Sequence, residues 1–544
     1  MKGTDQGQAK RALCEKAYGL FREFRGAYVS EWQRLENCER MYRGDHWHDV
    51  PQLDRNEPRP VTPIIQSTVE NIKAELLDRV PEAVILPESP KDGDVAHVIE
   101  AIIRQNHDAD GYVKEYRKLV HDLLVGGYCV QEVGYDTTLN AGLGGAFIRH
   151  VDTRSILLDP LATDAQESRA IFKISLKTRE YIESRFPKSA PFLTADAFGN
   201  DAVEDGILHG DRNGAMLFLE YWWREFDAET ERSTVHMAQI AGNQVLSDSR
   251  DTKPEGMFEH GMYPFVITTM FVRKGSCLGL GLVDMFETQQ RYADKLDQIV
   301  LKNALMASHN KLLVTEASGF DTEDLRDWSR EVHRGESLNG VTWFSTPPLP
   351  SYIIGYINSI REGIKQESGA NDFSRGTANG GVTAASAIAA MQEMSNKRAR
   401  MMARLLHESF RDAVRFEIDV EREFNFFTRR VNVTINGETQ ERTFESAMLV
   451  KKAPGNALLP IEFYISVKAQ QETKYSAMSQ NELALRMLQS GMMTPQQAVE
   501  LMVFEGKDQL LKQLKEQSEK AEALAKQQLQ QALPLKAGGA GRKA

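Results

Sequence analysis

The stretch Gly369-Ala-Asn-Asp-Phe-Ser-Arg-Gly-Thr-Ala-Asn-Gly-Gly381 decides the fold, because a strong helix-forming segment follows this Gly- and Asn-rich loop directly. Thr383 offers an N-cap side chain, and the alanines after it are the best helix formers. No proline or glycine interrupts the segment before Phe427, so it predicts a helix about 60 Å long. This length exceeds that of ordinary globular helices and indicates a large assembly in which the loop faces something that moves.

Two more helices with thin apolar stripes are predicted upstream of the loop. Apolar residues in 282–308 fall near coiled-coil spacing, and isoleucines recur at steps of three and four in 352–368. A compact insert, residues 310–350, lies between them. It is predicted to hold a helix at 321–333 between two short strands, 311–314 and 341–344.

The rest of the chain mixes both periodicities. Helices are predicted at 9–43, after Thr62-Pro63 (a capping residue with proline at the first helical position), at 94–125, after Thr494-Pro495 and at 508–533. Strands are predicted at 129–135, 155–158, 171–176, 216–223, 265–272, 431–435 and 461–467, with a hairpin turn at Gly242-Asn243. The fold class is therefore α+β and mainly helical, with a disordered tail at 536–544.

Composition narrows the function classes. The chain has 544 residues, with 66 Lys and Arg against 77 Asp and Glu, so its net charge is −11. A protein that simply coats nucleic acid needs a positive balance, so this chain meets DNA only locally or lets it slide. Its four cysteines have no CxxC spacing and are interpreted as reduced thiols of a cytosolic product. No signal peptide and no membrane-spanning run is apparent.

Enzyme and metal signatures are missing from the sequence. There is no GxxxxGK[ST] nucleotide loop, no HExxH, no GxSxG and no EF-hand spacing. His46 and His48 lack a nearby Cys or carboxylate at ligand spacing, so a surface loop is the favoured interpretation. Asp419 and Glu423 lie one helical turn apart and are interpreted as part of a solvated face. We expect no catalytic residues, no cofactor and no metal.

Two sets of residues are candidates for contact with DNA. In the loop, Arg375 stands among Ser374, Thr377 and Asn379, which favours weak, reversible phosphate contacts over an ordinary surface loop; no lysine follows that would complete a nucleotide cradle. The long helix carries Lys397, Arg398, Arg400 and Arg404, and further on Arg411 and Arg415, against only Glu408 and Asp412. A basic girdle near DNA and a solvated or intersubunit ion-paired face are equally good interpretations of these residues.

The order of these segments resembles that of tailed-bacteriophage portal proteins. Glu367-Ser-Gly-Ala-Asn-Asp-Phe-Ser-Arg-Gly376, Gly381-Val-Thr-Ala-Ala-Ser-Ala-Ile388, Gly127-Tyr-Cys-Val-Gln-Glu-Val-Gly-Tyr-Asp136 and Ile156-Leu-Leu-Asp-Pro160 are similar to stretches in portals of the short-tailed P22 type. The resemblance covers roughly residues 10–470 in order, which makes it more specific than a single motif. The segment after 470 is less diagnostic.

The resemblance implies a non-enzymatic ring, usually of twelve copies, at one capsid vertex of the virion. Double-stranded DNA enters through it, driven by a terminase, and leaves through it at ejection. The other implied partners are a head-to-tail adaptor and the major capsid and scaffolding proteins, with assembly in the host cytoplasm and no membrane. The implied domains are 1–280 (N-terminal helices and an α/β wing), 281–309 (first stem helix), 310–350 (clip, which docks terminase and adaptor), 351–371 (second stem helix), 372–383 (tunnel loop), 384–430 (long wing helix), 431–475 (strands of wing or crown) and 476–544 (crown or short helical barrel).

Two alternatives remain at this point. One is a packaging ATPase or nuclease subunit of a DNA phage, which the missing nucleotide loop disfavours. The other is an elongated cytosolic scaffold with no relation to DNA.

Overall fold

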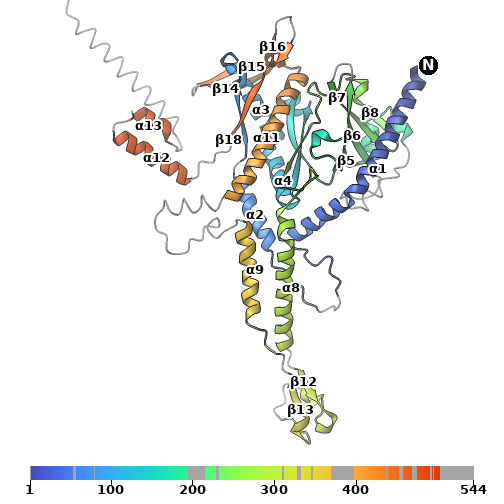
Figure 1. Cartoon of the computed structure of the whole chain (residues 1–544), viewed down its shortest axis with the longest axis vertical. Coiled ribbons are helices and arrows are strands. Elements are labelled where there is room, and N and C mark those ends of the chain that lie inside the picture. Colours follow the sequence, from blue (N-terminus) through green and yellow to red (C-terminus); the bar gives the residue numbers. More distant parts are fainter. Residues whose placement is uncertain are drawn as a thin grey trace, which may run out of the picture. The chain divides into compact units, whose positions relative to one another are not determined.

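The computed structural model (Figure 1) divides the chain into two compact units, Met1–Ala469 and Gln470–Ala544. It describes residues 2–502 except 53–56, 79, 194–214, 228–231, 309–310, 327–331, 345–346, 369–396, 436–437, 453–457, 469–473, 491–492 and 494. The predicted helix over 508–533, the tail after 536 and the quoted loop all lie outside these residues.

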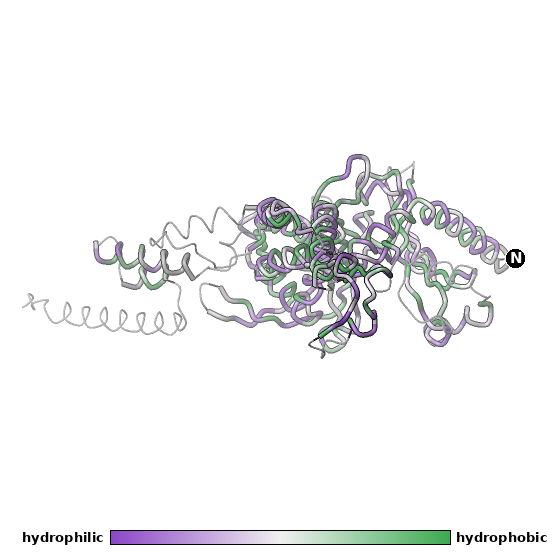
Figure 2. The backbone as a smooth tube through the Cα atoms, turned by 90° about the horizontal axis from the view of Figure 1, so that it is seen from below, coloured by the Kyte–Doolittle hydropathy of each residue, from purple (hydrophilic) through white to green (hydrophobic). Residues whose placement is uncertain are grey.

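The N-terminal helix α1 (Lys2–Tyr42) confirms the helix predicted at 9–43. Hydrophilic and hydrophobic residues are interspersed along this helix, as Figure 2 shows near the N-terminus. Its apolar stripe enters the core of the first unit, where Phe21 and Phe24 are fully buried and each meets the ring of Phe172 edge-on, with centroids 5.6 Å apart. The predicted period of three to four therefore marks the buried face.

Helix α2 (Ile64–Leu77) begins where expected, but the predicted cap is wrong. Pro63 is the N-cap residue and supplies no side-chain hydrogen bond. The Thr62 hydroxyl donates instead to Asp297, at 2.8 Å. The first N–H groups of α2, those of Ile64 and Ile65, donate to the side-chain oxygen of Gln290, each at 3.2 Å. A side chain from a distant helix thus satisfies the helix end, which a local sequence rule does not predict.

The single helix predicted over 94–125 is two helices, α3 (Gly93–Asp110) and α4 (Tyr112–Val125). Gly111 separates them with a φ of +72°, a left-handed conformation that glycine adopts without steric cost. Apolar residues recur at helical spacing on both sides of Gly111, so the periodicity alone does not reveal the break between the two helices.

Two antiparallel sheets carry most of the predicted strands. One has the order β3-β2-β9, with β2 (Tyr128–Asp136), β3 (Gly145–Val151) and β9 (Phe265–Thr269). The other has the order β4-β5-β6-β7-β8, with β4 (Ile156–Leu158), β5 (Ala170–Thr178), β6 (Ala215–Asp227), β7 (Arg232–Ala241) and β8 (Gln244–Asp248). The predicted Gly242-Asn243 turn joins β7 to β8, with φ values of 51° and 59° that suit a primed hairpin turn. The single strand predicted over 265–272 ends at Thr269, and β10 (Phe271–Val272) pairs with β11 (Gly279–Leu280).

Segments from the last third of the first unit complete its body. Helix α11 (Lys397–Phe424) packs against β2, β3 and β9, and β18 (Phe463–Lys468) pairs with β1 (Glu82–Pro87). The long helix ends at Phe424 rather than Phe427, and its predicted beginning lies outside the described residues. The predicted strand at 431–435 is β14 (Arg429–Ile435), paired with β15 (Glu438–Phe444). Six of the described strands were not predicted: β1, β3, β11, β15, β16 (Val450–Lys452) and β17 (Leu458–Pro460). Several are short, and β15, with the sequence Glu-Thr-Gln-Glu-Arg-Thr-Phe, is mostly polar.

The helix–insert–helix arrangement is confirmed, apart from the helix inside the insert. Helices α8 (Leu282–Ser308) and α9 (Tyr352–Ser368) pack against each other, and β12 (Lys311–Val314) pairs with β13 (Val341–Phe344) (Figure 1). Among the described part of 321–333 only a single 3-10 turn occurs, Asp324–Arg326. Leu325 there is only half-buried, and a short segment without a packed face does not sustain an α-helix.

The second unit contributes two described helices, α12 (Lys474–Gln489) and α13 (Pro495–Leu501). The start of α13 at Pro495 agrees with the prediction that a helix opens after Thr494-Pro495. Helix α12 was not predicted.

Candidate functional site

Helix α11 carries the described part of the predicted DNA-contact residues. Its inner face is apolar, with Leu406, Phe410 and Val414 at most 1% exposed. The loop candidates Ser374, Arg375, Thr377 and Asn379 lie outside the described residues. Lys397 opens the helix, and Arg398, Arg400 and Arg404 in its first turns are exposed.

Four of the basic residues predicted on α11 form a stripe along one side of the helix. At about 100° per residue, Arg400, Arg404, Arg411 and Arg415 fall within a wedge of about 60°, over about 22 Å of helix. We call these four residues the α11 arginine stripe; all are exposed. Arg398 falls about 160° away from Arg400 and lies outside the stripe. The stripe therefore contains four of the six basic residues that the sequence suggests as a girdle.

Among the described residues, the ion pairs at the far end of the stripe are weak. Asp412 lies 3.6 Å from Arg411 and 3.8 Å from Arg415, and all three side chains are at least 45% exposed. Pairs this exposed and this long contribute little to stability. The two guanidinium groups are therefore accessible to a phosphate or carboxylate from another molecule.

A buried polar network lies beneath α11 and fixes its position. The Glu421 carboxylate is fully buried and accepts hydrogen bonds from Asn106 Nδ2 at 2.6 Å and from the Ala146 N–H at 2.8 Å. Arg429 lies 3.4 Å from the same oxygen and donates to Asn106 Oδ1 at 2.8 Å. Burial raises the pKa of Glu421 and lowers the pKa of Arg429, so desolvation disfavours the charged form of each side chain. The network ties α11 to α3, β3 and β14.

The sequence interpretation of acidic residues on α11 as solvated is wrong. Glu423 accepts from Lys253 Nζ at 2.6 Å, and its side chain is 15% exposed. Asp419 pairs with Arg422 at 2.6 Å, and burial raises its pKa. Glu417, which accepts from His107 Nε2 at 2.9 Å, is fully buried. The signal that was missed is the i, i+4 spacing of Glu417 and Glu421 on the apolar face of the helix.

A second polar cluster anchors the proximal half of α8. His46 and Asp294 are both 2% exposed, and His46 Nδ1 lies 2.6 Å from the Asp294 carboxylate. The other ring nitrogen of His46 lies 2.9 Å from the Met41 carbonyl. One turn on, Asp297 accepts from Arg361 of α9 at 2.9 Å. His46 thus belongs to a buried structural contact and not to the surface loop that was predicted.

The distal half of the α8–α9 pair exposes apolar side chains. On α8, Ile299 is 47% exposed and Leu305 is 42% exposed. On α9, Tyr352, Ile354 and Tyr356 are each at least 59% exposed. A single chain leaves this surface, which we call the distal α8–α9 surface, in contact with water. Large apolar side chains exposed on two packed helices are typical of an interaction site.

The insert between α8 and α9 also exposes large apolar side chains. Leu313 on β12 is 52% exposed and Trp343 on β13 is 65% exposed. They lie on opposite faces of the two-stranded sheet, because Trp343 is paired with Leu312 and Leu313 is paired with Thr342. An isolated two-stranded sheet is marginally stable in water. A partner protein that covers this sheet would therefore stabilise it.

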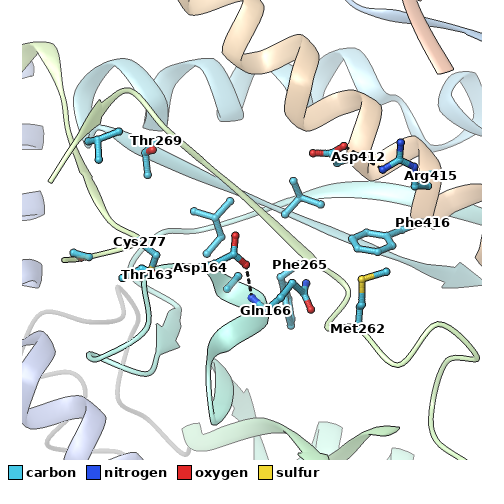
Figure 3. A pocket seen from close by; sticks show the side chains of 15 residues that line it. Thr163, Asp164, Gln166, Met262, Phe265, Thr269, Cys277, Asp412, Arg415 and Phe416 are labelled. Atoms are coloured by element: carbon cyan, nitrogen blue, oxygen red, sulfur yellow. Dashed lines mark hydrogen bonds and ion pairs between the residues drawn. The ribbon is translucent and has the colours of Figure 1, made fainter. Parts of the chain in front are cut away.

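A groove of about 480 Å³ runs along β9 (Figure 3). Asp412, Arg415 and Phe416 of α11 line one side. Gln166 of the 3-10 turn Ala165–Glu167 and the N-cap residue of that turn, Asp164, line another. The groove meets the α11 arginine stripe at Arg415. We call it the β9 groove.

None of the described helices combines the length and apolar character needed to cross a bilayer. Within the same residues, no group of three or more His, Cys, Asp or Glu side chains is arranged to hold a metal ion.

Comparison with known proteins identifies the family. No curated protein matches this chain at a significant level. Residues 19–540, however, match the family of phage P22-like portal proteins, which covers both units and all the surfaces described above. The chain belongs to the family of phage P22-like portal proteins.

Proposed function

We propose that copies of this portal protein close into a ring around the channel that conducts double-stranded DNA through one capsid vertex. The family supports the portal role and an oligomeric ring in general. The observation that carries the ring is the distal α8–α9 surface. Full burial of one such side chain contributes about 1.5–3 kcal/mol, so each half-exposed residue contributes about 1 kcal/mol when a neighbour covers it. A head-to-tail contact repeated around a closed ring supplies this cover in every copy.

In this proposal α8 and α9 form the stem, and residues 310–350 form the clip. Each subunit presents its stem to both neighbours, and twelve is the subunit number that the resemblance implies. The clip docks terminase during packaging and the head-to-tail adaptor afterwards. Exposed Leu313 and Trp343 support an apolar docking surface there. The body around the two sheets is the wing, which meets the major capsid and scaffolding proteins during assembly in the host cytoplasm.

DNA contact in this proposal is weak and local. The net charge of −11 opposes a tight grip on phosphates, which would stall the moving duplex. The α11 arginine stripe and the loop residues Ser374, Arg375, Thr377 and Asn379 provide the reversible contacts, with residues 372–383 at the narrowest part of the channel. Replacing Arg375 and shortening 376–381 is expected to spare ring assembly and impair packaging. Normal genome-filled particles from this variant would refute the loop's role.

The protein acts as a structural conduit, and the motor is a separate protein. Neither the described residues nor the family favours the packaging ATPase or nuclease alternative. Light scattering of the purified chain tests the ring: we expect a mass that is a multiple of 61.3 kDa. A parallel nucleotide-hydrolysis assay is expected to give no turnover. A monomer at high concentration that hydrolyses nucleotide would refute the proposal.

A further inference from the structure

One edge of the β3-β2-β9 sheet is open along β9. The N–H of Met270 donates to the Gly127 carbonyl, and the N–H of Val133 donates to the Pro264 carbonyl. In the antiparallel register, these bonds direct the even-numbered residues of β9 toward β2. Phe265, Ile267 and Thr269 therefore direct their N–H and C=O groups to the outer edge. In the described part of the chain, no further strand pairs with this edge.

At one end of this edge, the side chain of Gln166 makes hydrogen bonds in the position of a neighbouring strand. Gln166 Nε2 donates to the Tyr263 carbonyl at 2.9 Å, and the Tyr263 N–H donates to Gln166 Oε1, also at 2.9 Å. Tyr263 has the same parity as Phe265 and Ile267. The Gln166 carboxamide thus makes the two hydrogen bonds that a backbone in the next strand position would make. The β9 groove continues along the edge from this point (Figure 3).

The open edge lacks the features that protect edge strands from association. The sequence Phe-Val-Ile-Thr-Thr of β9 contains no charged residue and no proline, and its side chains are mostly β-branched or aromatic. Natural edge strands usually carry a charge, a proline or a bulge that prevents pairing with other chains. An unprotected edge beside a groove fits an extended peptide that adds one strand.

We propose that a strand of a neighbouring copy occupies the β9 groove and extends the β3-β2-β9 sheet across the subunit boundary. This inference rests on the proposed ring. A five-residue strand is only about 17 Å long, and a stable interface buries about 1,200–2,000 Å². The strand contact is therefore too small to hold a free peptide. A second copy of the chain can supply the remaining buried area, because the exposed apolar side chains of the distal α8–α9 surface would be buried in the same contact between subunits.

Residue-resolved hydrogen exchange on the unassembled chain and on the ring tests this proposal. In the unassembled chain, the amides of Ile267 and Thr269 are expected to exchange fast, while those of Val266 and Thr268, bonded to β2, exchange slowly. In the ring all four are expected to exchange slowly, with Ile267 and Thr269 slowed at least about 100-fold. The even-numbered amides are an internal control for the integrity of β9.

A proline substitution provides the second test. Thr269→Pro removes an N–H that faces the groove and leaves the N–H groups that bond to β2. The matched control Thr269→Val keeps the N–H and the side-chain shape. Loss of one interchain hydrogen bond is expected to raise the concentration needed for half-assembly about fivefold for Thr269→Pro, and to leave it unchanged for Thr269→Val.

The outcomes separate this inference from the ring itself. A ring in which Ile267 and Thr269 exchange as fast as in the unassembled chain would overturn the strand contact and leave the ring intact. Slow exchange of both amides before assembly would also overturn it, because the cover would come from within the chain. Protection that appears only after scaffolding or capsid protein is added would assign the groove to another protein. Absence of any ring in light scattering would refute the proposed function, and with it this inference.

Discussion

The buried Arg429–Glu421 contact predicts how firmly α11 is held. Both side chains are at most 1% exposed, so Arg429→Met leaves the Glu421 carboxylate buried without its cation. Breaking a buried pair by removing one partner costs about 3–5 kcal/mol. The bonds from Asn106 and the Ala146 N–H remain, so we expect a loss near the lower limit, about 3 kcal/mol.

The measured quantity is the free energy of opening of α11, obtained from native-state hydrogen exchange at the buried amides of Phe410 and Val414. The double variant Arg429→Met/Glu421→Gln removes both charges and is expected to cost less than the single change. Arg430→Met is the matched control, because Arg430 is 80% exposed in its pair with Glu441 and is expected to change stability by less than about 0.5 kcal/mol. An Arg429→Met variant that opens no more easily than Arg430→Met would refute the reasoning.

Four further predictions concern assembly, pH, docking and DNA. Ile299→Asp is expected to block ring formation in light scattering while leaving the circular dichroism of the chain unchanged; normal rings would contradict the role of the distal α8–α9 surface. Burial lowers the pKa of His260 from 6.5 to about 4. The Met262 N–H donates to its Nδ1, so the folded protein holds this imidazole in its neutral form. The stability that neutral His260 contributes is present above pH 6.5 and is lost as the pH falls toward 4. His260→Gln is expected to flatten the dependence of the thermal unfolding temperature on pH over this range. Deleting 315–340 is expected to leave the ring intact and abolish pull-down of terminase and adaptor; capture of both by the deletion would refute it. Arg404→Glu with Arg411→Glu is expected to reduce packaged DNA in assembled particles, with unchanged genome content as the contrary result.

The helices and the longer strands follow from local periodicity. Residues 282–308 form α8 with the predicted bounds, and the hairpin at Gly242-Asn243 has the backbone that its residues require. In each case the pattern in sequence is itself the physical cause, a stripe that packs or a turn that needs positive φ.

Long-range contacts account for most of the errors. Gln290 caps α2 from more than 200 residues away, and no local rule connects them. His46 has a buried partner in Asp294, which the sequence places 248 positions later. The edge orientation of β9 depends on its register with β2, which only the paired backbone reveals. Among the basic residues predicted as a girdle, Arg398 lies on a different side of α11 from the stripe, and their contact with DNA stays a prediction.

Electron microscopy of the purified full-length protein tests the central claim most directly. The account predicts ring-shaped particles with an open central channel, in which the α8–α9 pairs of adjacent subunits are in contact. Uniform single-chain particles at concentrations that support virus assembly would contradict it.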